Sequence, residues 1–364
     1  MANENLGNAK KAKNDEFYTQ FSDIQKEMNA YLEYNPDVFR DKTVLLPCDD
    51  PEWSNFTKYF AQNFEALGLK KLISTSYAPD SKPDAIPYQP TLFEMESPGY
   101  DPEKTQTKGK IFTLTHDKTG DNVINVDDLE WSYLEGGGDF RSEEITKLRD
   151  EADIIVTNPP FSLFREFLAW LVGADKDFVI LGNVNAITYK EVFPLIKDNK
   201  MWLGQSISSG DREFRVPDSY PLNAAGWRVD EEGQKFIRVK GVRWFTTLDH
   251  GRRHEPLSLM TEADNIKFSK HKEVKGIGYQ KYDNYDAIEV PFTDSIPSDY
   301  DGVLGVPITF LDKYSPEQFA IVGMAAGNIR GLAGIPTSTG KDGPYMGGKL
   351  KYGRILIKHK QVTK

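Results

Sequence analysis

The chain has few of the features that mark secreted or membrane proteins. Its 364 residues include a single cysteine, Cys48, which excludes an internal disulfide and is compatible with a reducing compartment. It lacks an apolar run of membrane-spanning length, and its first residues lack the apolar core of a secretory signal. We therefore expect a cytoplasmic protein that does not contact a membrane.

The chain also lacks an excess of positive charge, because 55 acidic residues outnumber 45 lysines and arginines and the formal net charge is −10. This balance argues against indiscriminate coating of nucleic acid but allows a local basic face. Basic residues cluster at 10–13, 250–254, 267–275 and 349–354. Each cluster alone is more typical of a solvated surface, and only their convergence on one cleft would indicate a nucleic-acid contact.

Two common ligand motifs are missing. The chain has no GxxxxGK[ST] phosphate loop, and the acidic stretch from Asp117 to Asp128 lacks the glycine at the sixth position of a calcium-binding EF-hand loop. We interpret that stretch as a turn and expect no metal site.

What is present is a repeated alternation of strands and helices over residues 40–205. A strand is predicted at 43–46 and a second at 71–76, with Ser54 as the cap of the helix between them and Gly68 as its end. This is a β-α-β unit, the building block of a parallel sheet. The sequence therefore predicts an α/β fold.

The pattern divides the chain into three parts. Residues 1–204 are expected to form the core, with residues 79–128 as a proline-rich, irregular insertion. Helical periodicity weakens over 205–300, although a strand near 242–248 is expected to rejoin the sheet. Residues 301–364 would complete the fold.

Helices are also expected near both ends of the chain. Residues 16–34 carry a partial apolar stripe at helical spacing. Residues 303–323 are predicted to form a strand followed by a helix, with Ser315-Pro316 at the start of that helix.

The most informative motif is Asn158-Pro159-Pro160-Phe161. The apolar run just before it predicts a buried strand, and the apolar spacing just after it predicts a helix. The motif would therefore form a stiff loop at the carboxyl end of a strand, where open α/β sheets bind ligands. A plain turn is the simpler alternative, since Asn-Pro and Pro-Pro are common in loops.

This loop suits methyl transfer to the exocyclic amine of a planar base. The amine nitrogen is a poor nucleophile because its lone pair is delocalised into the ring, and two acceptors aimed at its hydrogens would free that lone pair. The Asn158 side-chain oxygen and the Pro159 carbonyl can be these acceptors, stabilising charge that grows only in the transition state. Both prolines hold their carbonyls stiffly because the ring fixes φ, and Phe161 offers a face on which a base can stack.

Taken in chain order, several segments resemble one known family. They are Asp15-Glu16-Phe17-Tyr18-Thr19, Cys48-Asp49-Asp50-Pro51 with Ser54-Asn55-Phe56, Gly138-Asp139-Phe140-Arg141-Ser142, and Asn158-Pro159-Pro160-Phe161-Ser162-Leu163-Phe164-Arg165-Glu166. Segments at 183–191, 281–290 and 305–311 extend the match over nearly the whole chain. The combination resembles the EcoRI-type DNA adenine-N6 methyltransferases, and it is more specific than the Asn-Pro-Pro-Phe loop, which many amine methyltransferases share.

The resemblance implies a Rossmann-like class I methyltransferase, with a mostly parallel twisted sheet, helices on both faces and an irregular target-recognition region at 205–300. It also implies S-adenosylmethionine as methyl donor and double-stranded DNA as substrate, with the target base flipped against Phe161. The catalytic residues would be Asn158, Pro159, Pro160 and Phe161.

A set of cofactor-binding residues follows from the same resemblance. Asp139 would accept a hydrogen bond from the adenine amine of the cofactor, with Phe140 beside the adenine ring. The full set is Phe17, Tyr18, Thr19, Asp49, Asp50, Ser54, Asn55, Tyr77, Asp139, Phe140 and Asn158. The usual glycine-rich loop after the first strand is absent, and which of the two neighbouring aspartates contacts the cofactor stays open.

For DNA contacts, the resemblance points to the arginines of 205–300, with Arg252 and Arg253 as candidates. GAATTC is the first expectation for the recognition sequence, with methylation of its inner adenine. A monomer is expected, alongside a cognate restriction endonuclease that would form no stable complex with it. Two alternatives stay open: a methyltransferase acting on RNA or protein glutamine, and a catalytically silent DNA-binding regulator.

Overall fold

The computed structural model describes residues 18–49, 54–78, 95, 99–208, 210–216, 220, 222, 226–326 and 343–360. They form two compact units, the first spanning Met1–Asn183 and Ser209–Leu248 and the second Val184–Ser208 and Asp249–Lys364. Within the described ranges, no helix combines the length and the apolar character needed to span a membrane.

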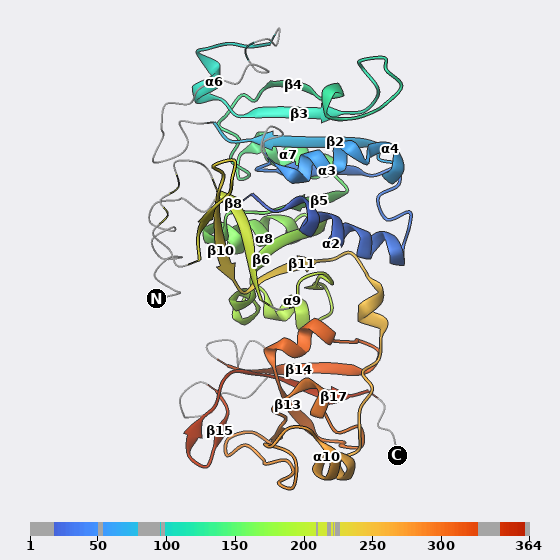
Figure 1. Cartoon of the computed structure of the whole chain (residues 1–364), viewed down its shortest axis with the longest axis vertical. Helices are drawn as coiled ribbons and strands as arrows, with labels where there is room; N and C mark the ends of the chain where they lie inside the picture. Colours follow the sequence, from blue (N-terminus) through green and yellow to red (C-terminus); the bar gives the residue numbers. More distant parts are fainter. Residues whose placement is uncertain are drawn as a thin grey trace. The chain divides into compact units, whose positions relative to one another are not determined.

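A large sheet forms the centre of the first unit (Figure 1). Its strands are β1 (Thr43–Pro47), β2 (Lys71–Ser76), β3 (Lys110–Leu114), β4 (Glu130–Tyr133), β5 (Ile154–Thr157), β6 (Asp177–Asn183) and β11 (Val242–Thr246). They lie in the order β4-β3-β2-β1-β5-β6-β11. Neighbours among β2, β1, β5 and β6 are parallel, whereas β3, β4 and β11 pair antiparallel. The chain is therefore mixed α/β, as the alternating sequence pattern predicts.

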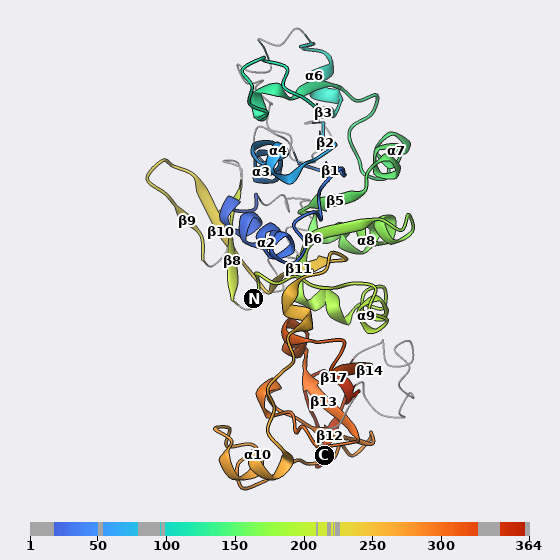
Figure 2. The same ribbon diagram turned by 90° about the vertical axis from the view of Figure 1, so that its right-hand side faces the viewer.

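Helices cover both faces of this sheet. On one side lie α2 (Phe21–Tyr34), α3 (Asn55–Gln62) and α4 (Phe64–Leu67), and on the other lie α7 (Glu143–Glu151) and α8 (Phe164–Val172) (Figure 2). Because both faces are covered, β1 and β5 are buried along their whole length. This burial explains why these strands are continuous apolar runs in the sequence.

The segment from Ser54 to Gly68, predicted as one helix, forms the two helices α3 and α4, and its two ends lie where the sequence predicts them. The side chain of Ser54 accepts a hydrogen bond from the Phe56 N–H at the start of α3, and that of Ser142 accepts one from the Ile145 N–H at the start of α7. Gly68 ends α4 with a φ of 63°, a left-handed conformation that favours glycine.

The helix α2 has a polar pair on its buried face. Ile24 and Met28 are buried, as the apolar stripe predicts, and Tyr31 and Glu27 are buried beside them. The Tyr31 hydroxyl donates to the Glu27 carboxylate at 2.5 Å. Burial, together with Glu27, raises the pKa of Tyr31 well above its usual value, so the hydroxyl remains a donor.

The first unit also contains a small antiparallel sheet in the order β8-β10-β9, built from β8 (Asp211–Val216), β10 (Lys235–Lys240) and β9 (Arg228–Val229). Tyr18 is fastened to it, because the Tyr18 N–H donates to the Arg215 carbonyl at 2.9 Å and the Arg215 N–H donates back at 3.2 Å. The remaining short helices are α6 (Lys104–Thr107), η2 (Val126–Asp128) and η3 (Phe161–Leu163).

The second unit is built on a separate sheet in the order β12-β13-β17-β14. Its strands are β12 (Ala287–Glu289), β13 (Val303–Pro307), β14 (Phe319–Ala325) and β17 (Arg354–His359), with β7 (Trp202–Leu203) and the hairpin of β15 (Tyr345–Met346) and β16 (Lys349–Leu350) elsewhere in the unit. Its helices are η4 (Val184–Thr188), α9 (Phe193–Lys197), η5 (Gly251–His254), α10 (Glu262–Phe268), η6 (Thr293–Ser295) and η7 (Ile308–Lys313).

The two units cut across the three parts drawn from the sequence. Residues 184–204 lie in the second unit, whereas 209–248 return to the first. The return occurs because β11 pairs antiparallel with β6 in the central sheet.

The helix predicted to start at Ser315 is wrong. The Ser315 carbonyl accepts hydrogen bonds from Gln318 and Phe319, which closes a single turn. The chain then continues as β14, paired antiparallel with β17. A strand partner far along the chain therefore overrides the local helix-start signal.

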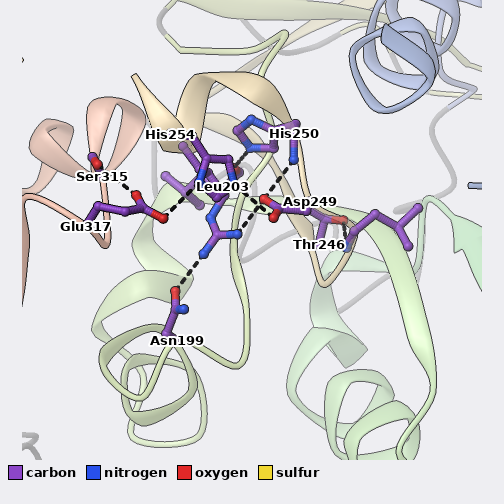
Figure 3. A network of polar contacts seen from close by, with 10 residues as sticks. Asn199, Leu203, Thr246, Asp249, His250, His254, Ser315 and Glu317 are labelled. Atoms are coloured by element: carbon purple, nitrogen blue, oxygen red, sulfur yellow. Dashed lines mark hydrogen bonds and ion pairs between the residues drawn. The ribbon is translucent and has the colours of Figure 1, made fainter. Parts of the chain in front are cut away.

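Within the second unit, a polar network joins η5 to other segments (Figure 3). Arg253 donates to the Asp249 carboxylate at 2.6 Å and to the Asn199 side chain at 2.7 Å. Its guanidinium also lies 3.5 Å from the centroid of the Trp202 ring. Three partners thus hold Arg253 in place.

His254 lies between two carboxylates in the same network. One ring nitrogen is 2.9 Å from Asp249 Oδ2, and the other is 2.9 Å from Glu317 Oε1. A neutral imidazole has one N–H, so only the charged ring can donate to both. Burial by itself lowers the pKa of His254, but the hydrogen bonds to Asp249 and Glu317 outweigh it and raise that pKa.

We predict that His254 stabilises the folded chain in a pH-dependent way. Because its pKa is raised on folding, the stabilisation is complete below the ordinary value of 6.5 and is lost as the pH rises through the folded-state value. The loss of urea midpoint caused by His254→Gln should therefore be larger at about pH 6 than at about pH 8.5. The control is His116→Gln, because the His116 ring is hydrogen-bonded to the neutral Thr115 hydroxyl at 2.8 Å. An equal loss at both pH values would contradict the prediction.

Candidate functional site

The candidate site lies at the carboxyl edge of the parallel strands. In the order β2-β1-β5-β6, the chain leaves β1 toward β2 on one side and leaves β5 toward β6 on the other. The loops after β1 and β5 therefore diverge from neighbouring strand ends, which is where such sheets bind ligands. Asp49 follows β1 and Asn158 follows β5, so the two loops singled out in the sequence meet at this point.

Asp49 is buried at this edge, and only 7% of it is exposed. One carboxylate oxygen accepts from the Ser54 hydroxyl at 2.8 Å, and the other accepts from the Thr157 hydroxyl at 2.5 Å. Its backbone carbonyl accepts from the hydroxyls of Thr57 and Ser74. Asp49 is thus fixed between the start of α3, the strand β2 and the end of β5.

The Asn-Pro-Pro-Phe loop is short and closed by its own backbone. Asn158, Pro160 and Phe161 are half-buried, whereas Pro159 is buried. The Pro160 carbonyl accepts a hydrogen bond from the Leu163 N–H at 2.9 Å, which forms the turn η3 before α8 begins. The loop therefore has little freedom to move on the strand that carries it.

A third segment reaches the same edge through Gly138. The φ of Gly138 is +82°, and a Cβ at this position would lie 2.3 Å from the Ser76 carbonyl oxygen. The neighbouring Gly137 carbonyl accepts from the Ala78 N–H at 2.9 Å. Only glycine allows this close approach to the end of β2.

Asp139 is held by the arginine that follows it. Arg141 donates to the two Asp139 carboxylate oxygens at 2.9 and 2.6 Å and to Glu166 of α8 at 3.2 Å. Hydrogen bonding to Asp139 is the main reason that the pKa of Arg141 is raised. The arginine links the Gly-Asp-Phe segment to the helix after the Asn-Pro-Pro-Phe loop.

The Phe140 ring, expected beside the cofactor adenine, is buried in the core of the first unit. It is 1% exposed and packs edge-on against Phe167, with 5.0 Å between ring centroids, and against Trp170 at 5.6 Å. The Arg141 guanidinium lies 5.5 Å from the centroid of the same ring, so Phe140 anchors the segment in the core between α8 and Arg141.

Tyr77 and Cys48 meet where β2 and β1 end. The Cys48 thiol donates to the Tyr77 hydroxyl oxygen at 3.5 Å, and the Phe140 backbone also bonds that hydroxyl. Burial, followed by Cys48, raises the pKa of Tyr77, so its hydroxyl stays neutral. Cys48 has a φ of 78°, an unusual conformation for a side chain other than glycine and typical of strained functional loops.

The segment before α2 lies beside the start of α3. The Asn55 amide donates to the Thr19 carbonyl at 2.7 Å. The Thr19 hydroxyl is buried and, among the residues that the structure describes, has no hydrogen-bond partner. A buried hydroxyl in this state is suited to a polar ligand. Phe17 and Asp50, which were expected at the site, lie outside the described residues.

Arg252 and Arg253, the two arginines proposed to contact DNA, differ in exposure. The Arg253 side chain is 6% exposed and is held by Asp249 and Asn199, so it is not available to a phosphate, and we revise its role to a structural one. Arg252 is half-buried and donates to the Gln205 carbonyl at 3.1 Å, which leaves it as the candidate for DNA.

The sequence analysis assigned no site role to two residues, Thr157 and Arg141, that hold the site together. Thr157 is fully buried, and its hydroxyl contacts both Asp49 and the Pro47 carbonyl. Its only sequence signal is a polar residue at the end of an apolar strand. Arg141 lies two residues after Asp139, so an ion pair between them could be expected from the sequence. Its second partner, Glu166, is distant in sequence and could not.

An α/β unit that gathers an acidic loop and an Asn-Pro-Pro-Phe loop at one sheet edge is typical of methyltransferases that act on amines. The family is found by comparison, since residues 5–360 match the family described as adenine-specific methyltransferase EcoRI. The chain belongs to this family.

Named relatives cover the whole chain. Type II methyltransferase M.EcoRI of Escherichia coli is 42% identical over 363 residues, which is 100% of this chain and 98% of that protein. Type II methyltransferase M.MpnI of Mycoplasma pneumoniae is 34% identical, with 97% of each chain covered, and M.MgeORF184P of Mycoplasma genitalium is 33% identical, with 97% of this chain and 98% of that protein covered. No solved structure matches the chain. The chain is an adenine-specific DNA methyltransferase.

We predict that Gly138→Ala destabilises the fold more than a matched glycine change. The left-handed φ alone costs an alanine roughly 1–2 kcal/mol, and the contact with the Ser76 carbonyl adds to this. The control is Gly120→Ala, because Gly120 has a φ of +77° but nothing within 4 Å of the added Cβ. Urea midpoints compare the two variants, and equal losses would rule out the close approach at Gly138.

Proposed function

We propose that the chain transfers a methyl group from S-adenosylmethionine to N6 of adenine in duplex DNA, and that the Asn158 loop performs this step. The observation that carries the proposal is the contact between Thr157 and Asp49, which joins the acidic loop to the Asn-Pro-Pro-Phe loop at 2.5 Å. The strand order β2-β1-β5-β6 with helices on both faces supports a Rossmann-like class I fold.

The residues at the sheet edge fit S-adenosylmethionine. The buried Thr19 hydroxyl, which lacks a hydrogen-bond partner in the described ranges, is a donor for a carboxylate, and the acidic loop suits a cationic amine. When bound, the cofactor supplies an electrophilic methyl group. The residues that would hold it are Phe17, Tyr18, Thr19, Asp49, Asp50, Ser54, Asn55, Tyr77, Asp139, Phe140 and Asn158, of which Phe17 and Asp50 lie outside the described residues.

Asn158 activates the target amine in this proposal. Its side-chain oxygen accepts one amine hydrogen and the Pro159 carbonyl accepts the other, which draws the nitrogen toward tetrahedral geometry. The buried Pro159 and the short turn at Pro160 keep these acceptors fixed before the reaction, so little reorganisation is needed. The residues stabilise the positive charge that grows on the nitrogen in the transition state.

The target adenine would have to leave the duplex to reach this loop. Phe161 is half-exposed at the start of η3 and would stack against the flipped base. Arg252 would contact the DNA backbone. We take GAATTC, with methylation at the inner adenine, as the recognition sequence to test first, because the M.EcoRI relative is 42% identical. A monomer in the cytoplasm, working beside a restriction endonuclease that it does not bind stably, completes the proposal.

The proposal is tested by locating the methyl group. Purified protein and labelled S-adenosylmethionine are incubated with duplex DNA containing GAATTC, with the same DNA altered at one base, with RNA and with protein. We expect N6-methyladenine at the inner adenine of GAATTC. Label in RNA or protein and none in any DNA would overturn the proposed substrate, whereas label at another DNA sequence would replace GAATTC alone.

In the same assay, Asn158→Ala should abolish methyl transfer. The expected loss is on the order of 100-fold or more, by analogy with the removal of one transition-state acceptor or donor in other enzymes. Cofactor binding, measured by calorimetry, should weaken only a few-fold, because Asn158 is one of several residues that would hold the cofactor and the acidic loop is untouched. Near-normal turnover in this variant would refute the role given to Asn158.

Arg252→Ala should weaken DNA binding to a similar extent on all sequences. If Arg252 contacts a phosphate, the slope of log affinity against log salt should fall by about 1. Binding is measured by fluorescence anisotropy over a series of salt concentrations, and the affinity for the cofactor alone serves as the control. An unchanged slope would assign Arg252 to the structure of the second unit, as for Arg253.

A further inference from the structure

The hydroxyl of Thr157 stands at the junction of the two loops. Thr157 is the last residue of β5 and directly precedes Asn158, and none of it is exposed. Its hydroxyl lies 2.5 Å from Asp49 Oδ2 and 2.8 Å from the Pro47 carbonyl oxygen. Both partners belong to the end of β1 or to the loop after it. One side chain therefore connects the strand that carries the catalytic amide to the loop that would face the cofactor.

The contact has a direction that matters for Asp49. Both neighbouring oxygens are acceptors, so the hydroxyl must be the donor, and the charged carboxylate is the stronger acceptor. The other carboxylate oxygen accepts from Ser54, which also caps α3. Two buried hydroxyls thus set the rotation of the Asp49 carboxylate. Ser54 fixes it from its own loop, whereas Thr157 fixes it from the neighbouring strand.

Backbone pairing between β1 and β5 does not reach the loops that follow these strands. The register of β1 with β5 pairs Val44 with Ile154 and Leu45 with Ile155. Beyond these pairs, the end of β5 is joined to the loop after β1 by the hydrogen bond that the Thr157 hydroxyl donates to Asp49. A side-chain bond is therefore what extends the contact of the two strands to the loops.

We propose that Thr157 is a positioning residue, which sets Asn158 relative to the cofactor loop through its hydrogen bond to Asp49. The proposal rests on the proposed function for the meaning of that position, although the bond itself can be tested without turnover. Because reacting groups must be held within a fraction of an ångström, loss of this bond should lower the methyl-transfer rate about 10- to 100-fold.

The test compares Thr157→Val with Thr157→Ser. Valine keeps the shape of threonine and removes the hydroxyl, whereas serine keeps the hydroxyl and removes a methyl group. With saturating cofactor and DNA, single-turnover rates should fall about 10- to 100-fold in Thr157→Val and stay within about threefold of wild type in Thr157→Ser. Equal rates in Thr157→Val and wild type would overturn the proposal, as would equal losses in the two variants.

A second measurement does not depend on turnover. Amide hydrogen exchange of the free protein reports opening of the loop after β5, through the N–H groups of Phe161, Ser162 and Leu163. We expect faster exchange there in Thr157→Val and wild-type exchange in Thr157→Ser. Unchanged exchange in Thr157→Val would overturn the positioning role, whether or not the protein methylates DNA. Absence of methylation on every DNA substrate would instead refute the proposed function.

A double-mutant cycle keeps the proposal testable if Thr157→Val loses stability. Asp49→Asn keeps the shape of the side chain and removes its charge, so the hydrogen bond donated by Thr157 becomes weaker. If Thr157 works through Asp49, the rate loss from Thr157→Val should shrink in the Asp49→Asn background, at saturating cofactor. Independent losses that multiply would show that Thr157 acts through packing and would overturn the proposal.

Discussion

Parallel pairing of β1 with β5 is the constraint on which the rest of the first unit depends. Parallel strands end at the same edge, and neighbouring connections that diverge leave an opening there. This brings Asp49 and Asn158 together although they are distant in sequence. The same pairing needs helices on both faces of the sheet, because strands buried on both sides cannot face water. The site and the core are therefore consequences of one topological choice.

Polar groups that are buried at the sheet edge need hydrogen-bond partners within the protein. Asp49 is buried, and hydroxyls from Ser54 and Thr157 supply its hydrogen bonds. Gly138 lets a third segment approach closely enough to complete the edge. An acid that would be costly to bury alone is therefore hydrogen-bonded to the start of α3, to β2 and to the end of β5. The features that fit a cationic cofactor are thus the same ones that fix the geometry of the loops.

The second unit shows how a charged residue can have a role that its position in the sequence does not reveal. Arg253 belongs to a basic cluster that suggests nucleic acid, but it stacks on Trp202 and bonds to Asp249 inside the unit. Arg252, its neighbour, is more accessible. A cluster of like charges therefore divides between an interior network and the surface, and only the packing of η5 decides which residue does which.

The sequence by itself determined the α/β class, the helix cap at Ser54 and the loop that carries Asn158, because these depend on periodicity and on contacts within a few residues. The family followed from motifs in a fixed order. Only the tertiary structure decided that Phe140 faces the core and that Phe319–Ala325 is a strand. The same holds for the contact between Thr157 and Asp49. Each of these outcomes depends on a partner far along the chain, and local sequence carries no record of which distant residue will fill that place.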